Sequence, residues 1–183
     1  FSSKYIRSVI AAKGLAVIGP SSNRAHSFES AFKAQRSGFI AGGHDLPNPL
    51  IREKLGLNII GGATIAYHAY INSYGSELEA MTLAAKHSKV TLSLMVDTYN
   101  YKQGIKNAIS VAKKIKSHVK KEIKIVVDSG DLYKNTVFVR KELDRAGLKD
   151  IKITVASNLD EFKIAELLKK RIPADTFIVN TEA

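Results

Sequence analysis

The sequence has 183 residues, 45% of them hydrophobic and 25% charged, which is enough apolar material for an ordinary buried core. It contains no cysteine, which excludes disulfide bonds and thiolate metal sites, and no apolar run approaches the roughly 20 residues that span a bilayer. The formal net charge is +11 and the pI is near 9.7. A charge of this size can attract phosphates, nucleic acid or an anionic membrane.

The first half of the chain alternates short apolar runs with amphipathic stretches. The predicted strands are Leu15–Ile18, a short run at Phe39–Ala41, and Leu57–Ile60. The predicted helices are Lys4–Ala12, Ser27–Arg36, Pro49–Leu55 and Ser76–His87.

The second half repeats this alternation with longer elements. Its strands are continuous apolar runs, as expected when both faces of a parallel sheet are covered. An open doubly wound sheet and a barrel both satisfy this pattern, and periodicity does not choose between them. The predicted strands are Val90–Val96, Ile123–Val127, Ile151–Ala156 and Thr176–Val179, and the predicted helices are Lys102–Val119, Leu132–Ala146 and Leu159–Lys170.

The densest positive charge lies between Lys102 and Lys124, where many lysines accompany one acid, Glu122. Ile105 and Ile109 recur at helical spacing within this stretch. We therefore expect an amphipathic helix with a lysine-covered outer face, and a polyanion-binding face is the alternative. No aromatic residue interleaves with the lysines, so base stacking is not indicated.

Polar residues follow the predicted strands at their carboxyl ends, where ligands bind in both candidate architectures. Their recurrence at successive strands is more informative than any single residue. These residues are Asp97, Thr98 and Tyr99, then Asp128, Ser129, Gly130 and Asp131, then Ser157 and Asn158, and finally Asn180 and Thr181.

The segment from Asp128 to Leu132 has two interpretations. Ser129 or Asp131 can cap the following helix, and Gly130 permits a tight turn. Amides at that helix start could instead hold a phosphate, and the two carboxylates could bind Mg²⁺.

His68 follows the glycine-containing stretch 61–64. A neutral imidazole can act as a base or as a nucleophile that carries a phosphoryl group, although a lone histidine is more often structural. No histidine pair has the spacing of a metal site.

Taken in order, segments along most of the chain resemble the nicotinate phosphoribosyltransferase family, a type II phosphoribosyltransferase family. The longest matches are to V-D-T-Y-D…G-V-P-N-A-I, to L-D-S-G-D-L and to A-S-N-D-L-D-E-Y. The matching segments are Arg24–Ala25, Phe39–Gly42, Ser76–Ala80, Val96–Asn100, Gly104–Ile109, Val127–Leu132, Val139–Gly147 and Ala156–Phe162.

The resemblance implies transfer of the phosphoribosyl group of 5-phosphoribosyl 1-pyrophosphate (PRPP) to nicotinate, coupled to ATP hydrolysis and dependent on Mg²⁺. It implies an α/β fold, an incomplete TIM-type (β/α) barrel. Residues 1–183 would then form a single barrel segment that lacks most of the family's amino-terminal domain and its last strands. A homodimer or a partner chain would complete the barrel. Phe1 is not an initiator methionine, so we expect a processed product or a piece of a longer polypeptide, and a cytoplasmic location without membrane attachment.

The resemblance also assigns roles to residues. His68 would be phosphorylated, with Asp128 as the other catalytic residue, and Arg24 would bind phosphate or the nicotinate carboxylate. Asp97, Asp128 and Asp131 would serve ribose, Mg²⁺ or the phosphohistidine, with Asp128 and Asp131 as the metal ligands. The other substrate-binding residues would be Ser129, Gly130, Ser157, Asn158 and Thr181.

The sequence departs from the family at ligand-contacting positions. Asn23 and Val126 stand where the family has arginine, and Ile178 and Asn180 replace glycines of its phosphate loop. One interpretation is an active but divergent enzyme. The other is a catalytically decayed homologue that serves as a structural or nucleic-acid-binding subunit.

Overall fold

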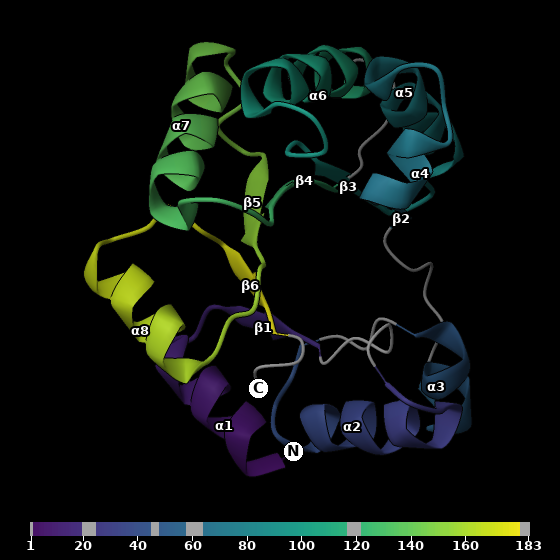
Figure 1. Ribbon diagram of the computed structural model, residues 1–183, viewed down its shortest axis with the longest axis vertical. Coiled ribbons are helices and arrows are strands. Elements are labelled where there is room, and N and C mark those ends of the chain that lie inside the picture. The colour runs from purple at the N-terminus through teal and green to yellow at the C-terminus, as the bar shows by residue number, and fades with distance from the viewer. Residues whose placement is uncertain (1, 20–24, 45–47, 58–63, 117–121, 180–183) are drawn as a thin grey trace. The chain divides into compact units, whose positions relative to one another are not determined.

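The computed structural model describes residues 2–19, 25–44, 48–57, 64–116 and 122–179. Strands and helices alternate along the chain, as predicted (Figure 1). Every strand pair with an assigned register is parallel. The chain divides into two compact units, one of residues 61–154 and one that combines residues 1–60 with 155–183. The prediction of an α/β protein with a parallel sheet is therefore confirmed.

The helices of the described residues include none long and apolar enough to cross a membrane. They are α1 (Ser2–Ala11), α2 (Phe28–Ile40), α3 (Pro49–Lys54), α4 (His68–Asn72), α5 (Glu77–His87), α6 (Tyr101–Lys116), α7 (Leu132–Arg145) and α8 (Glu161–Lys169). The strands are β1 (Ala16–Ile18), β2 (Thr64–Ala66), β3 (Thr91–Met95), β4 (Glu122–Val127), β5 (Lys152–Val155) and β6 (Thr176–Ile178).

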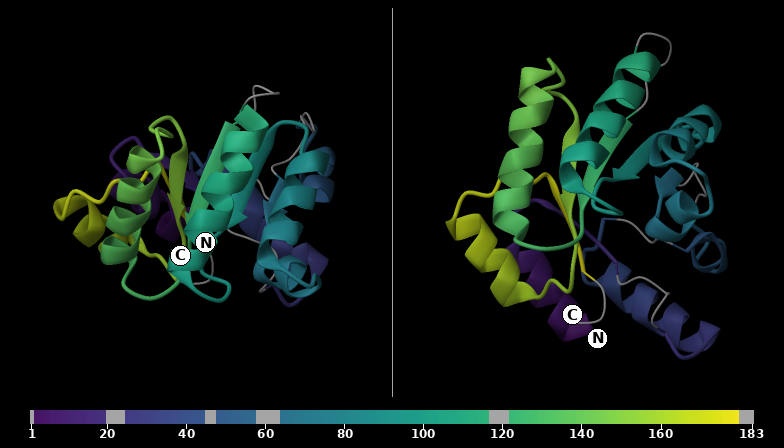
Figure 2. Two further views of the ribbon diagram at one scale, coloured as in Figure 1. Left: turned by 90° about the horizontal axis from the view of Figure 1, so that it is seen from above. Right: turned by 45° about the horizontal axis from the view of Figure 1, so that its top comes forward.

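In the unit of residues 61–154, the strand order is β5-β4-β3-β2. Leu92 of β3 lies opposite Ile123 of β4, and both are buried. α5 packs against α6, and α6 packs against α7, so these helices form a row along the strands (Figure 2). Because the strands are parallel, the residues that follow β2, β3 and β4 emerge at the same edge of the sheet.

The other unit is assembled from both halves of the sequence. β1 pairs with β6 in parallel, with Val17 opposite Phe177, and α1 packs against α8 and α2. Arg7 of α1 donates from Nε to Oε1 of Glu161 in α8 at 2.7 Å. Contacts between residues about 160 positions apart therefore hold this unit together.

One strand prediction in the first half is wrong, and a second lies mostly outside the described residues. Phe39–Ala41 is not a strand, because Phe39 and Ile40 form the last turn of α2 and the amide of Ala41 donates to the Ser37 carbonyl. The strand predicted at Leu57–Ile60 does not include Leu57, and residues 58–60 lie outside the described residues. β2 occurs later, at Thr64–Ala66, and α4 follows it. Neither of these two short elements was predicted.

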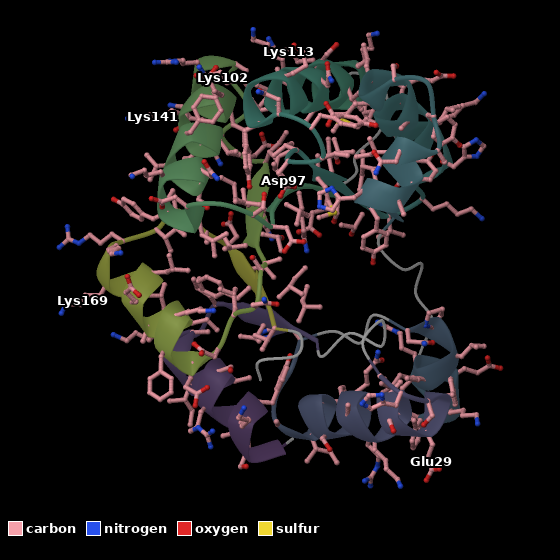
Figure 3. The ribbon with its side chains drawn as sticks, viewed as in Figure 1. Glu29, Asp97, Lys102, Lys113, Lys141 and Lys169 are labelled. Atoms are coloured by element: carbon pink, nitrogen blue, oxygen red, sulfur yellow. The ribbon has the colours of Figure 1, made fainter. Side chains whose placement is uncertain are left out.

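The lysine-rich stretch forms α6, as predicted as far as Lys116, and residues 117–119 lie outside the described part of the chain. Ile105 and Ala108 are buried, whereas Lys102 and Lys113 are exposed. Figure 3 shows these two lysines on the side of α6 that points away from the strands. The predicted amphipathic helix is therefore confirmed.

Candidate functional site

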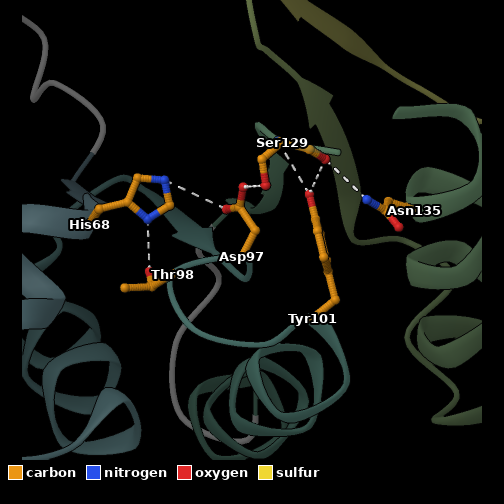
Figure 4. A network of polar contacts seen from close by, with 6 residues as sticks. All are labelled: His68, Asp97, Thr98, Tyr101, Ser129 and Asn135. Atoms are coloured by element: carbon orange, nitrogen blue, oxygen red, sulfur yellow. Dashed lines mark hydrogen bonds and ion pairs between the residues drawn. The ribbon is translucent and has the colours of Figure 1, made fainter. Parts of the chain in front are cut away.

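The candidate site lies at the carboxyl edge of the sheet in the unit of residues 61–154. His68 begins α4 directly after β2, and Asp97 and Thr98 follow β3. Asp128 and Ser129 follow β4. Hydrogen bonds and one charge contact connect four of these side chains, as drawn in Figure 4. The predicted gathering of strand-end residues therefore exists for β3 and β4, and His68 joins it from the end of β2, a strand that was not predicted.

The His68 ring is held on one side only. Its Nδ1 lies 2.9 Å from Oγ1 of Thr98, which is a hydrogen bond. Its Nε2 lies 3.8 Å from Oδ1 of Asp97, beyond hydrogen-bond range but close enough for a charge interaction. The His68 side chain is 40% exposed, whereas that of Asp97 is 1% exposed. The ring is thus oriented from inside while Nε2 remains accessible to a ligand.

Asp97 is a buried carboxylate with unequal oxygens. Oδ2 accepts a short hydrogen bond of 2.6 Å from Oγ of Ser129. Oδ1 is buried and accepts no hydrogen bond from any residue that the structure describes. A buried carboxylate oxygen without a donor is costly, and such atoms mark functional positions in native proteins. Oδ1 faces Nε2 of His68, so it is placed to interact with positive charge on the imidazole ring.

Local structure in the turn after β4 accounts for two residues of the segment Asp128–Leu132, Gly130 and Asp131. Gly130 has φ +68°, which a residue with a side chain adopts only with strain, and a Cβ there would lie 3.0 Å from Nδ2 of Asn135. Oδ1 of Asp131 accepts the amide of Lys134 and so caps α7. Asp131 therefore performs the capping role, while the Ser129 hydroxyl is directed to Asp97 instead.

A second polar chain links two other matching segments. Nδ2 of Asn107 in α6 donates to Oε2 of Glu77 in α5 at 2.7 Å, and Nε2 of Gln103 donates to Oδ1 of Asn107 at 2.9 Å. Burial is the main reason that the pKa of Glu77 is raised, and the nearby charge of Asp97 adds to it, while the Asn107 hydrogen bond acts in the opposite direction. Glu77, Asn107 and Gln103 thus form a chain of hydrogen bonds between α5 and α6.

Gly104 is required where α6 passes the end of β3. A Cβ at this position would lie 2.1 Å from the carbonyl oxygen of Val96. Only glycine allows the backbone of α6 to approach the strand so closely. This contact fixes the start of α6 relative to Asp97, the next residue in the chain after Val96.

The remaining predicted site residues belong to the other unit or lie outside the described residues. Ser157 and Asn158 follow β5 in the other unit with positive φ values of 80° and 46°, and the Asn158 carbonyl accepts from Nζ of Lys163. Arg24 and Thr181 lie outside the described residues, as do Asn23 and Asn180. Val126 is buried in β4.

Asp128 and Asp131, the predicted metal ligands, have different surroundings. Within the described ranges, no group of three or more histidine or acidic side chains could hold one. Asp131 is engaged by Lys134, through the amide at Oδ1 and through Nζ 3.2 Å from Oδ2. Mg²⁺ that is bound together with substrate phosphates needs only one or two protein carboxylates. Asp128 is partly buried and follows β4 directly, at the carboxyl edge of the sheet.

Sequence reasoning did not identify two residues of the network. Tyr101 and Asn135 both contact the backbone of Ser129, from α6 and α7 respectively. Tyr101 is separated from Ser129 by 28 positions, so no local spacing connects them. The available signal was weaker, namely a polar or aromatic residue at the start of each helix that follows a strand end.

Comparison with known proteins identifies the relatives of the chain. It is 35% identical over 182 residues to the nicotinate phosphoribosyltransferase pncB2 of Mycobacterium tuberculosis, covering 99% of the chain and 38% of that protein. It is 35% identical over 160 residues to the nicotinate phosphoribosyltransferase of Bacillus subtilis, covering 87% of the chain and 32% of that protein. No protein-family model matches the sequence.

Solved structures agree with this relationship. A nicotinate-nucleotide pyrophosphorylase from Pyrococcus furiosus superposes with a TM-score of 0.82 and 26% identity, over 98% of this chain and 45% of that one. Human nicotinic acid phosphoribosyltransferase has the same fold, with a TM-score of 0.75 at 17% identity. The chain spans 38% of the Mycobacterium tuberculosis protein, 32% of the Bacillus subtilis protein and a little under half of the two solved chains. By homology the chain belongs to the nicotinate phosphoribosyltransferase family, and it matches part of the length of the family members.

Proposed function

We propose that the protein formed by this chain transfers the phosphoribosyl group of PRPP to nicotinate, which gives nicotinate mononucleotide and pyrophosphate for NAD biosynthesis. The observation that carries the proposal is the approach of His68 to the buried, unpaired Oδ1 of Asp97 at the carboxyl edge of a parallel sheet. The names of the relatives support the same substrates. The alternative of a decayed structural or nucleic-acid-binding homologue is not favoured by these relatives.

In this proposal His68 attacks the γ-phosphate of ATP and ADP leaves, and water later hydrolyses the phosphohistidine to release phosphate. In the tautomer that donates from Nδ1 to Oγ1 of Thr98, Nε2 carries the lone pair that attacks phosphorus. Thr98 fixes the plane of the ring, and Asp97 stabilises the positive charge that the imidazole gains. ATP supplies the phosphoryl group and so the driving force.

We assign the substrate contacts by position at the strand ends. Asp128 lies at the edge where PRPP would bind, and with Mg²⁺ it would neutralise the pyrophosphate charge and aid its departure. Gly130 lets the backbone of the turn approach a ligand closely. Arg24, Ser157, Asn158 and Thr181 remain proposed contacts of phosphate or nicotinate.

The incomplete barrel is likewise a proposal. It is supported by the parallel strands and by the superposition on family structures of which this chain covers about half or less. A barrel segment of this kind requires further strands from additional polypeptide, a second copy or a partner chain. The net charge of +11 suits a polyanionic substrate such as PRPP.

The direct test is an incubation of the protein with nicotinate, PRPP, ATP and Mg²⁺, followed by chromatography of nicotinate mononucleotide. We expect product with the unchanged protein and with His87→Ala, since His87 is exposed at the end of α5. His68→Ala should give none. Absence of product from the unchanged protein, or equal product from His68→Ala, would contradict the proposal.

A further inference from the structure

The backbone amide and carbonyl of Ser129 are held by two side chains from different helices. The Tyr101 hydroxyl, at the first residue of α6, donates to the Ser129 carbonyl at 2.9 Å and accepts the Ser129 amide at 3.3 Å (Figure 4). Nδ2 of Asn135 in α7 donates to the same carbonyl at 3.0 Å. Both backbone groups of one residue are therefore fixed by side chains.

The chemistry of this contact is specific to a hydroxyl group. Only a group that both donates and accepts can bind the carbonyl and the amide of one residue at once. Burial is the main cause of a raised pKa at Tyr101, so the phenol keeps the proton that it donates. Gly130 leaves the space in which Asn135 reaches the carbonyl.

The consequence lies at the candidate site. With its peptide fixed, Ser129 directs Oγ to Oδ2 of Asp97 at 2.6 Å. That hydrogen bond sets the rotation of the Asp97 carboxylate, which leaves Oδ1 facing His68. A displacement of the Ser129 peptide would turn Asp97 and change the charge presented to the ring.

We propose that Tyr101 and Asn135 are positioning residues that act through Ser129 on the Asp97–His68 pair. They touch neither the imidazole nor the Asp97 carboxylate through any hydrogen bond of the described residues. The role rests on the proposed phosphorylation of His68. It predicts that their effect on the reaction disappears when the Ser129 hydroxyl is absent.

The kinetic test compares two single variants and their combination. Tyr101→Phe should lower the rate of His68 phosphorylation by ATP about fivefold, the loss expected for one hydrogen bond. Ser129→Ala should lower this rate at least as much, and Tyr101→Phe should add nothing to Ser129→Ala. Independent, multiplying effects of the two substitutions would overturn the proposal.

The matched control is Tyr133→Phe in α7. Tyr133 is partly buried, and its hydroxyl makes no hydrogen bond to any residue that the structure describes. This variant should phosphorylate His68 at the unchanged rate. Tyr101→Phe should also leave the KM for PRPP unchanged while kcat falls, because the hydroxyl positions Asp97 and binds no substrate; a rise in KM alone would contradict the positioning role.

Hydrogen exchange gives a readout that does not need activity. In Tyr101→Phe the Ser129 amide loses its acceptor, and its exchange should accelerate about fivefold, while Tyr133→Phe leaves it unchanged. Unchanged exchange in Tyr101→Phe would overturn the inference. If the unchanged protein forms neither phosphohistidine nor nicotinate mononucleotide, the proposed function fails, and the exchange measurement alone decides whether the Ser129 peptide is held as described.

Discussion

The two edges of the sheet in residues 61–154 each carry a carboxylate, and the two carboxylates have opposite environments. At the amino edge, Glu122 begins β4, and its Oε1 lies 3.0 Å from Nζ of Lys152. Its Oε2 lies 3.3 Å from Nζ of Lys124 and accepts from Thr91. At the carboxyl edge, Asp97 receives one hydrogen bond, and its other oxygen receives none.

This difference agrees with the proposed division between a carboxylate that supports the fold, Glu122, and one that takes part in the reaction, Asp97. Glu122 has partners from three strands and is partly exposed to water. Asp97 is buried, which makes its missing partner costly unless a ligand or a charged His68 provides one. In parallel α/β folds the carboxyl edge carries the site, and the amino edge contributes to stability. The following predictions test that division.

The largest effect should come from Asp97→Asn. The amide keeps the shape of the side chain but removes the charge facing His68, so the rate of nicotinate mononucleotide formation should fall about 100-fold. Thermal unfolding should show no loss of stability, because the substitution removes a buried charge. Glu122→Gln should change the rate less than about twofold. Similar losses in the two variants would abolish the distinction between the edges.

Gly104→Ala should destabilise the carboxyl edge. The new Cβ meets the Val96 carbonyl, so α6 or the end of β3 must shift, at a cost of about 2 kcal/mol in the free energy of unfolding. Urea unfolding measures this change. Gly75→Ala is the control, since a Cβ there has no atom within 4 Å, and it should be nearly neutral. A neutral Gly104→Ala would show that this close contact is not required.

Glu77→Gln should stabilise the protein at pH 7 by about 1 kcal/mol, because it removes a buried charge and leaves an acceptor for Asn107. The pKa of Glu77 is raised in the folded state, so its contribution is fully present below the ordinary value of 4.5 and is lost as the pH rises through the raised value. Urea unfolding at pH 7 and pH 4 should show that the advantage of the variant shrinks at the lower pH. An advantage that grows on acidification would contradict this sign.

Glu122→Gln should change the free energy of unfolding least, and it should destabilise the protein at pH 7 where Glu77→Gln stabilises it. Burial alone would raise the pKa of Glu122, but the Lys152 hydrogen bond and the Lys124 charge outweigh it and lower the pKa. Its stabilisation is present above the ordinary value of 4.5 and is lost as the pH falls through the lowered value. The variant should lose about 0.5 kcal/mol at pH 7 in urea unfolding and nothing near pH 3. A loss that persists at pH 3 would argue against an ionic origin.

The sequence predicts most of the strands and helices because the buried runs are long and their periodicity is clear. β4 and α7 lie almost where the pattern places them. β2 has only three residues, which is too short for a period to appear, and Phe39–Ala41 imitates a strand because the apolar run is one turn at the end of a helix.

The candidate site also has a part that sequence patterns predict and a part that they do not. Parallel strands bring Asp97 and Ser129 to one edge, as strand-end reasoning predicts, whereas His68 joins them after β2, a strand that the sequence pattern does not predict. The dual role of the Tyr101 hydroxyl depends on where α6 lies in space, and that placement depends on Gly104 fitting against Val96. Such contacts join distant positions through the backbone, and residue types alone do not specify them.

The pairing of β1 with β6 has a consequence for the order in which the chain folds during synthesis. Ala16 pairs with Thr176, and Arg7 binds Glu161, so the first helix and strand must wait for partners made about 160 residues later. At ribosomal speed that delay is on the order of ten seconds. Residues 61–154 are continuous in sequence and can collapse during it, while the apolar sides of α1 and β1 stay without their partners and are open to capture by chaperones.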